Sequence, residues 1–496
     1  MSLKISFQKD APKTVLCVGV HENSPVVCDP SCGDQTVSDL ITKAVANSTF
    51  KGKLSQSLSI FTPAGQRLIL IGLGPKEDKK TDNREVYWQK IGSAISCVLS
   101  CIGCTEASVD IHGEGEEDSF VLPNMALGTL LRSWRFEKYF TKKQPDELFR
   151  LKQVTFQTAT LEAVEKAFAP LAIVAEGVFL TRELVTEPAN VVTPATLALT
   201  AMSLQKVGVT VEVLEEADMK KLGMGALLGV GQGSAHDSKV AIMRWEGGQK
   251  GEAPIAFVGK GVTFDTGGLS LKPSTSMEDM KDDMGGAGVV IGLMQTLALR
   301  KAKVNAVGVI AIVENMPSST AQRPSDVVTS LSGQTIEVLN TDAEGRLILA
   351  DALWYTQDRF KPKFMIDLAT LTGAMIVALG KERAGLFATD DGLADKLLKA
   401  GEQVNELLWR FPLDDAYDKE INSTIADMKN IGSGRGAGSI TAAKFLQRFV
   451  NNVPWAHLDI ASVTLMDKDI PMAAKGATAF GVRLLNRFVA DNYEGK

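Results

Sequence analysis

The amino-acid sequence predicts an α/β protein with two domains, in which a helix joins a smaller N-terminal α/β domain to a larger C-terminal α/β domain with a central mixed sheet covered by helices. Three observations support this fold class. The chain has 496 residues, of which 45% are hydrophobic, whereas a single hydrophobic core stops growing at about 250–300 residues. Short β-rich runs alternate with helix-like segments near the N-terminus, and longer apolar runs follow further along the chain. Such alternation is typical of helices packed on a sheet.

The N-terminal domain is expected to cover residues 1–160. Its β-rich runs are KTVLCVGV, RLILIGLGP and ASVDIHGEG, and its helix-like segments include DQTVSDLITKAVAN and REVYWQKIGSAISCVLSCI. Because these two kinds of segment alternate, the pattern predicts a largely parallel sheet.

A long apolar-periodic segment predicts a joining helix over residues 161–188. We expect it to stop at Glu187-Pro188, because the residue before a proline is disfavoured in helical conformation.

The larger domain is expected to cover residues 189–496. Its apolar strands are longer, and they include IAFVG (255–259), AVGVIAIV (306–313) and FMIDLATL (364–371). Continuous apolar runs suit a central sheet with helices on both faces. In open α/β sheets, ligands bind outside the carboxyl ends of the strands, so we expect the functional residues there.

Charge and composition exclude several classes of function. The formal net charge is -6 and the pI is about 5.5, and acidic and basic residues are mixed along the chain, so nucleic acid is an unlikely partner. The N-terminus lacks the apolar region of a signal peptide, and nowhere do about 18 apolar residues run together. We therefore expect a cytoplasmic protein with no membrane segment.

The cysteines offer one possible metal site. Cys97, Cys101 and Cys104 are spaced so that they share one face of a predicted helix. A zinc site is one interpretation, but no fourth ligand of suitable spacing accompanies them. Small buried residues are the better interpretation, so we expect any metal to lie elsewhere.

Three polar segments interrupt the apolar pattern of the larger domain. They contain the carboxylates Asp265, Asp283, Asp342 and Glu344, together with Lys260, Lys272 and Arg346. The alternative interpretation makes each acid a turn or N-cap residue. Their joint placement between apolar elements instead favours convergence on one cleft. Crowded carboxylates raise one another's pKa values unless cations compensate, and divalent ions bridged by shared carboxylates are usual in hydrolytic sites.

The four histidines do not accompany these segments. They are His21, His112, His236 and His457. A histidine-based zinc protease and a Ser-His-Asp hydrolase are therefore disfavoured, and no G-x-S-x-G elbow is present. His457, in WAHLDIA, is expected to be structural.

The segment NTDAEGRL (340–347) resembles the signature of the leucyl aminopeptidase (cytosol aminopeptidase) family of two-metal exopeptidases. VGKGVTFDTGGLSLKP, MKDDMGGAG, ATLTGAM, ADMKNIGSGRGAGSITAAKFL and WAHLDIA resemble family segments in the same order, over roughly residues 180–480. The N-terminal domain resembles the family only in length and in the order of its elements. The sequence departs from the family after HLDIA, where Ser462 stands in place of the usual glycine.

The resemblance implies two divalent metal ions per subunit, Mn²⁺ or Zn²⁺. It implies that Asp265 and Glu344 bridge the metals, that Lys260 and Asp283 complete one site, and that Asp342 completes the other. Lys272 would polarise the scissile carbonyl. Arg346 would hold a bicarbonate ion that acts as the general base.

The resemblance also implies a substrate and an assembly. The substrate would be a peptide with a free N-terminus and a leucine-like first residue, and the protein would be a homohexamer. The implied substrate-binding residues are Met280, Asn340, Thr370, Leu371, Gly373 and Ala461. Two alternatives remain, namely a DNA-binding regulator, known from one branch of the family, and an assembly protein that keeps the fold without turnover.

Overall fold

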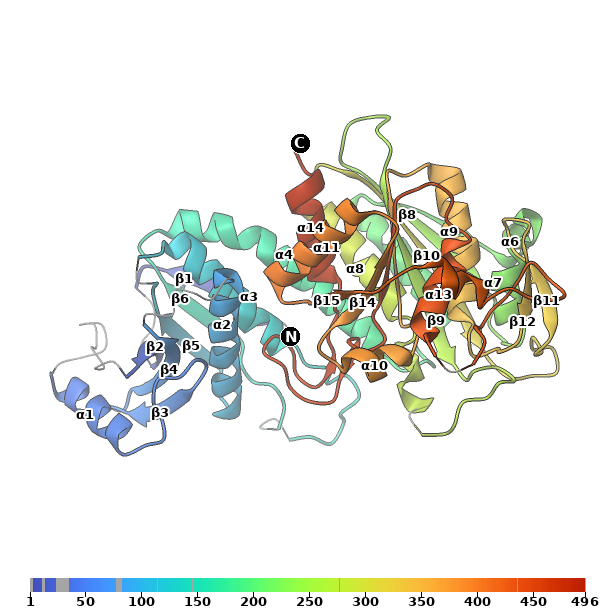
Figure 1. Cartoon of the computed structure of the whole chain (residues 1–496). Coiled ribbons are helices and arrows are strands. Elements are labelled where there is room, and N and C mark those ends of the chain that lie inside the picture. Colours follow the sequence, from blue (N-terminus) through green and yellow to red (C-terminus); the bar gives the residue numbers. More distant parts are fainter. Residues whose placement is uncertain are drawn as a thin grey trace. The chain divides into compact units, whose positions relative to one another are not determined.

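The computed structural model describes residues 3–10, 14–23, 35–76, 83–113, 115–144, 147–275, 277–434 and 436–495. The chain divides into two compact units (Figure 1). One contains Met1–Ala175 and Lys468–Lys475, and the other contains Glu176–Asp467 and Gly476–Lys496.

The first unit is built on a six-stranded sheet with the order β1-β6-β5-β2-β4-β3. Its strands are β1 (Lys4–Gln8), β2 (Val15–Glu22), β3 (Ser57–Phe61), β4 (Arg67–Pro75), β5 (Glu106–Asp110) and β6 (Gln153–Gln157). All neighbouring strands pair in parallel except β3 and β4. The largely parallel sheet predicted from the alternating pattern is therefore confirmed.

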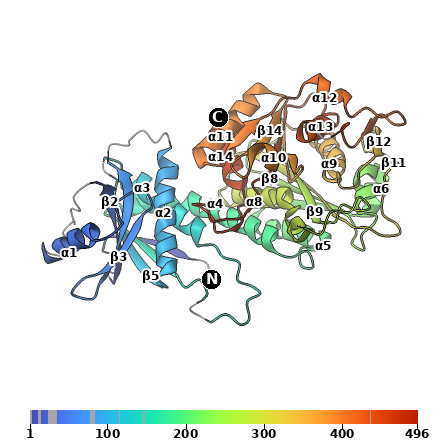
Figure 2. The ribbon, with the colours of Figure 1, turned by 60° about the horizontal axis from the view of Figure 1, so that its bottom comes forward.

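The helices of this unit are α1 (Gln35–Ala46), α2 (Arg84–Cys101) and α3 (Asp118–Ser133), shown in Figure 2. Cys97 and Cys104 are partly exposed and Cys101 is exposed, whereas Cys17 is buried. The interpretation of these three cysteines as buried residues on one helix face was therefore wrong, because α2 ends at Cys101, before Cys104, and the surface around them is only partly covered.

The first unit also contains a short segment from near the C-terminus of the chain, Lys468–Lys475. The Arg132 guanidinium donates to Asp469, and the Ser93 hydroxyl donates to the carbonyl of Pro471. Within the segment, Lys475 N donates to Asp469 Oδ1 at 2.9 Å. No sequence pattern indicated this return of the chain.

The boundary between the two units lies within helix α4 (Leu161–Thr186), between Ala175 and Glu176. It ends just before the Glu187-Pro188 pair.

The second unit is built on an eight-stranded mixed sheet with the order β15-β14-β17-β13-β9-β10-β8-β7. Its strands are β7 (Thr210–Leu214), β8 (Lys239–Glu246), β9 (Ile255–Asp265), β10 (Asn305–Asn315), β13 (Met365–Ala369), β14 (Ala384–Ala388), β15 (Leu408–Arg410) and β17 (Trp455–Asp459). The four central strands β17, β13, β9 and β10 pair in parallel. Their carboxyl ends therefore meet at one edge of the sheet.

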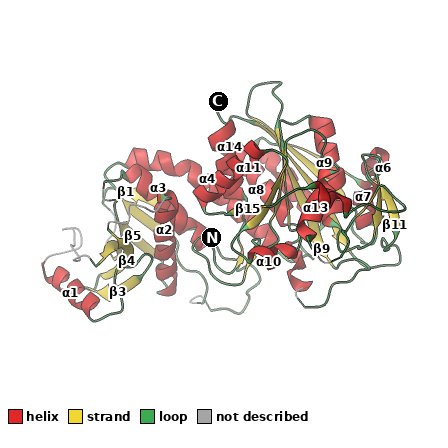
Figure 3. Ribbon diagram, in the orientation of Figure 1, coloured by secondary structure: helices red, strands yellow, loops and turns green. Residues whose placement is uncertain are grey.

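Helices cover both faces of this sheet (Figures 1 and 3). One layer consists of α5 (Pro194–Ser203), α8 (Gly285–Leu299), α11 (Asp391–Val404) and α14 (Val482–Tyr493), and the other consists of α7 (Gly225–Gly231), α9 (Gly345–Phe360) and α13 (Gly438–Gln447). An apolar core lies between the sheet and the second of these layers. Alternate residues of the strands, such as Val258 and Val309, pack there against Leu347 of α9. The predicted two-domain α/β fold is confirmed.

The remaining elements of this unit are short. They are η2 (Leu204–Val207), α6 (Glu216–Leu222), η3 (Met277–Asp282), β11 (Asp326–Thr329), β12 (Thr335–Val338), α10 (Ala374–Leu379), α12 (Asp415–Lys419), β16 (Met428–Lys429), β18 (Leu465–Met466) and β19 (Gly476–Ala477). Strands β11, β12 and β16 form a separate three-stranded sheet, and β18 pairs with β19. Within the described ranges, no helix combines the length and the apolar character required to cross a membrane.

One strand prediction needs correction, and one ligand segment follows a strand outside the central sheet. The strand predicted over 255–259 continues to Asp265, so Lys260 and Asp265 lie within β9 and not after it. The strand before Asn340 is β12, which belongs to the small sheet and not to the central one. Of the three polar segments, only the β9 segment thus belongs to a central strand.

Candidate metal centre

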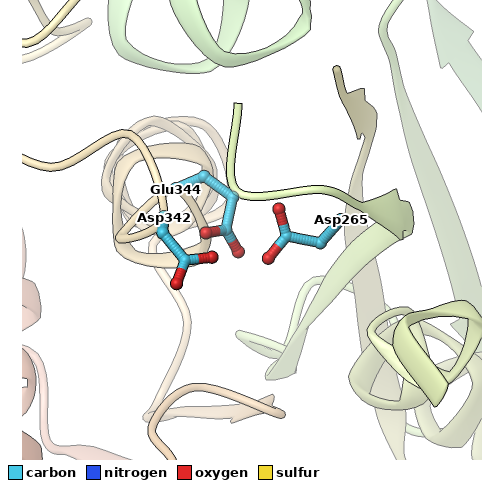
Figure 4. A group of neighbouring side chains, drawn as sticks. All are labelled: Asp265, Asp342 and Glu344. Carbon is cyan, nitrogen blue, oxygen red and sulfur yellow. The ribbon is translucent and has the colours of Figure 1, made fainter. Parts of the chain in front are cut away.

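Three carboxylates converge beside the carboxyl end of β9. Asp265 is the last residue of that strand, while Asp342 and Glu344 lie in the turn between β12 and α9. One carboxylate oxygen from each lies within 4.8 Å of the others. Figure 4 shows the three side chains pointing toward one another from two segments far apart in the sequence. The structure therefore brings together three of the predicted metal ligands.

Lys260 links a fourth carboxylate to this group. Its Nζ lies 2.6 Å from Asp283 Oδ1 and 2.8 Å from Glu344 Oε1, and it donates to the Thr370 carbonyl at 2.8 Å. The side chains of Lys260, Asp283 and Glu344 are all buried. Lys260 can stay within a buried strand because each of its donors finds an acceptor.

Lys272 lies on the other side of the cluster. Its Nζ is 2.9 Å from Asp265 Oδ2 and also forms an ion pair with Asp342. The Lys272 side chain keeps 21% of its surface exposed, whereas Asp265 keeps 2%. Lys272 is therefore the more accessible of the two lysines in the cluster.

The first residue of α9 must be small because Lys260 passes close to it. A Cβ atom at Gly345 would lie 2.6 Å from Lys260 Cε and 2.9 Å from Nζ. A residue larger than Gly345 would displace the lysine from its carboxylate partners, which explains why a glycine follows the acids directly and begins the helix.

The cluster carries more negative than positive charge, since the carboxylates of Asp265, Asp283, Asp342 and Glu344 surround two ammonium groups. Burial raises the pKa of Asp283 well above its ordinary value, and the neighbouring acids add to the effect although Lys260 opposes it. Burial also raises the pKa of Asp342, against the influence of Lys272. Burial disfavours the charged form of Lys260, but Asp283 and Glu344 outweigh it and raise the pKa of the ammonium group.

These residues fit divalent metal ions. Hard cations prefer carboxylate oxygens, and added positive charge would stabilise the charged forms of Asp283 and Asp342, which burial and the neighbouring acids disfavour. Asp283 Oδ2 is buried and has no hydrogen-bond partner among the residues that the structure describes. A buried acceptor of this kind has free lone pairs for a cation.

Arg346, in the first turn of α9, is held beside the cluster. Its Nη1 donates to the carbonyl of Asn430 at 2.7 Å, while its buried Nε has no hydrogen-bond partner in the described part of the chain. Burial lowers the pKa of Arg346 to about 10, against the influence of Glu344 and Asp459. The unpartnered Nε leaves this guanidinium with donor capacity for an anion.

Sequence reasoning missed two amides that hold the ligand segments. Asn315 Nδ2 donates to Asp265 Oδ1 at 2.8 Å and to the Thr341 carbonyl at 3.0 Å. The fully buried Asn430 accepts from Leu339 N at 2.9 Å and donates to the Asn340 carbonyl at 2.6 Å. Each amide joins segments far apart in the sequence, so no local pattern could have identified it.

The predicted substrate-binding residues are all at least partly exposed. They are Met280 in η3, Asn340 after β12, Thr370, Leu371 and Gly373 after β13, and Ala461 after β17. Thr370 Oγ1 donates to Asp283 Oδ1 at 2.7 Å, and Asn340 Oδ1 accepts from Asp342 N at 2.8 Å. These contacts place Thr370 and Asn340 directly beside metal-ligand candidates.

His457 lies within the core and not in the cluster. It is fully buried, and its Nδ1 lies 2.6 Å from Asp367 Oδ1. Its ring stacks on Phe387 and Trp455. These contacts agree with the structural role predicted for this histidine.

Comparison with known proteins identifies both parts of the chain. The model described as "Cytosol aminopeptidase family, catalytic domain" matches residues 179–486, and the corresponding N-terminal domain model matches residues 17–143. A probable cytosol aminopeptidase of Bradyrhizobium sp. is 53% identical over 463 residues, which cover 92% of each chain. One from Caulobacter vibrioides is 50% identical over 485 residues, which cover 97% of each chain.

A solved structure shares the architecture. The bottromycin maturation enzyme BotP in complex with Mn is 31% identical, with a TM-score of 0.84 over 97% of this chain and 99% of that one. Similarity of this extent covers both units and the carboxylate cluster. The chain therefore belongs to the cytosol aminopeptidase family and is a metallo-aminopeptidase, a hydrolase that acts at the N-terminus of peptides.

Proposed function

We propose that the protein is a cytoplasmic aminopeptidase that uses two divalent metal ions, Mn²⁺ or Zn²⁺, and prefers peptides with leucine-like N-terminal residues. The observation that carries the proposal is the convergence of Asp265, Asp342 and Glu344 within 4.8 Å, together with Asp283 on the far side of Lys260.

The ligand assignment follows the placement of these groups. By similarity to the family, Asp265 and Glu344 would be shared by both ions. Asp283 and Lys260 would complete one ion's ligands, and Asp342 would complete those of the other. When bound, such a pair of cations lowers the pKa of a coordinated water and polarises a carbonyl.

Lys272 and Arg346 would act on the reacting groups. The accessible ammonium of Lys272, beside Asp265 and Asp342, would hold the carbonyl oxygen of the scissile bond and stabilise the negative charge that develops there. Arg346, with its unpartnered Nε, would hold a bicarbonate ion able to accept a proton from the attacking water.

Substrate selection would depend on the loops around the cluster. A free α-amine is a good ligand for a metal ion, whereas an acylated amine is not, so only N-terminal residues would be released. Met280, Asn340, Thr370, Leu371, Gly373 and Ala461 would surround the first residue of the substrate. By similarity to the family, the N-terminal domain predicted over residues 1–160 would serve assembly of a homohexamer.

Hydrolysis of leucine p-nitroanilide by the purified protein tests this proposal. We expect release of p-nitroaniline that stops after chelation and returns with Mn²⁺ or Zn²⁺, and no release from the N-acetylated substrate. Glu344→Gln should lower kcat at least about 10³-fold, since a shared carboxylate holds both ions. The exposed Glu382→Gln is the matched control. Full activity of the Glu344 variant, or activity insensitive to chelation, would contradict the proposal.

A further inference from the structure

A buried carboxylate outside the metal cluster organises the loops beside that cluster. Asp459 is the last residue of β17 and is fully buried. Its Oδ1 accepts from Leu371 N at 3.2 Å, from Thr372 N at 3.4 Å and from Ala461 N at 3.3 Å. Its Oδ2 accepts from the Thr372 hydroxyl at 2.7 Å. One side chain thus binds both the loop after β13 and the turn after β17.

These donors offset the cost of burying the carboxylate. A buried carboxylate is stable only when hydrogen-bonded or paired, and hydrogen bonds to a charged acceptor are about twice as strong as neutral ones. Burial raises the pKa of Asp459, while the His457 imidazole, the Thr372 hydroxyl and the backbone amides oppose this. The loop geometry and the burial of Asp459 therefore depend on each other.

Thr372 extends this connection to a third segment. Its hydroxyl lies 2.5 Å from the hydroxyl of Ser439 in the first turn of α13, and both residues are buried. Asp459, Thr372 and Ser439 therefore join β17, the loop after β13 and helix α13 through side chains alone. Among the described residues, no hydrogen bond joins Asp459, Thr372 or Ser439 to the carboxylates of the metal cluster.

We propose that Asp459 is a positioning residue that determines the side-chain preference of the enzyme, acting through Thr372 and the backbone of Leu371 and Ala461. This inference rests on the proposed function, which assigns Leu371 and Ala461 to the pocket for the first substrate residue. Asp459 fixes the two walls of that pocket relative to each other. Loosening it changes the fit of a large side chain more than that of a small one.

Thr372→Val tests the proposal without removing the buried charge. Valine matches threonine in shape but lacks the hydroxyl, and the backbone bonds of Asp459 remain. We expect the ratio of kcat/KM for leucine p-nitroanilide to that for alanine p-nitroanilide to fall about tenfold, mainly through a higher KM for the leucine substrate. Thr372→Ser keeps the hydroxyl and should stay within about twofold of the wild-type ratio. Asp459→Ala should lower the ratio further.

A purely structural role predicts a different pattern. It would lower kcat/KM for both substrates by the same factor and leave their ratio unchanged, and that result for Thr372→Val would overturn the proposal. Because Thr372→Val preserves the charge of Asp459, failure of Asp459→Ala to fold does not affect this comparison.

Hydrogen exchange separates this inference from the proposed function. Thr372→Val removes the hydroxyl that joins the loop after β13 to Asp459 and Ser439, so it should speed amide exchange in peptides that contain Leu371 and Thr372 and leave α9 unchanged. If the wild-type protein cleaves neither substrate, the proposed function is contradicted. Hydrogen exchange still tests whether Asp459 and Thr372 hold the loop after β13. Unchanged exchange in the loop after β13 would overturn the role of Asp459 and Thr372 in holding it.

Discussion

At the scale of single residues, Lys272 is the clearest candidate for a group that acts on the substrate. It pairs with Asp265 and Asp342 and remains partly exposed. Lys272→Met should therefore lower kcat about 10²- to 10³-fold with little change in KM, as expected for loss of one group that stabilises a developing oxyanion. Steady-state kinetics on leucine p-nitroanilide measure this.

The matched control is Lys250→Met, which removes an exposed lysine from another part of the same unit. It should retain wild-type kinetics. A Lys272 variant with an unchanged kcat would remove this residue from the reaction.

The sequence alone indicates the charged residues of the site but not the residues that hold them. Lys260 and the four acids interrupt apolar runs, and buried charge in such a context is unusual. Asn430 and Asp459 lie in segments that resemble the family, but no local pattern indicates what they or Asn315 hold, because those partners lie far away along the chain. Only the folded structure shows that these residues organise the site.

At the scale of elements, the close approach of α8 to the central sheet requires a glycine at Gly286. A Cβ atom at Gly286 would lie 2.0 Å from the Leu368 carbonyl oxygen and 3.0 Å from Lys260 N. Gly286→Ala should destabilise the protein by about 1–3 kcal/mol, because the backbone must shift to make room. Activity should fall as well, since Lys260 shifts with β9.

Gly288→Ala is the matched control in the same helix. A Cβ atom there would meet its nearest neighbours at 3.5 Å and 3.6 Å, which is ordinary contact. Alanine in a helix interior is favoured over glycine by roughly 0.5–1 kcal/mol, so this variant should be at least as stable as the wild type. Denaturation midpoints compare the two, and equal loss in both would contradict the packing argument.

The element predictions were correct where apolar periodicity was strong and wrong where polar residues entered a strand. The continuous apolar run predicts a strand over 255–259, and Lys260 follows that run directly. In the structure Lys260 finds acceptors in Asp283, Glu344 and the Thr370 carbonyl, so β9 continues to Asp265. Tertiary pairing outweighed the local pattern.

At the scale of the whole molecule, stability should depend on Asp351. This buried residue of α9 accepts from Leu227 N at 2.9 Å and from Leu331 N at 2.7 Å. Burial raises the pKa of Asp351 to about 7 although these amides oppose it. Because an unfolded aspartate has a pKa of about 3.9, the folded state binds more protons between these values. The contribution of Asp351 to stability therefore falls as the pH rises toward 7.

Asp351→Asn removes this ionisation. Between pH 5 and pH 7, the unfolding free energy of the variant should rise relative to the wild type by roughly 2 kcal/mol. Asp358→Asn, an exposed position on the same helix, should show no such trend. Chemical denaturation at the two pH values measures both differences, and a constant difference for Asp351→Asn would refute the prediction.

The return of Lys468–Lys475 to the N-terminal unit has a consequence for how this chain can evolve. Arg132 and Asp469 are 337 residues apart in sequence, yet they form one contact. A recombination event with a crossover in α4 would exchange the N-terminal domain but leave Asp469 and Pro471 of the original parent facing foreign side chains. Successful chimaeras should therefore carry a second crossover near the end of the reading frame. This compact unit is built from two separate segments of the chain, and both must come from the same parent.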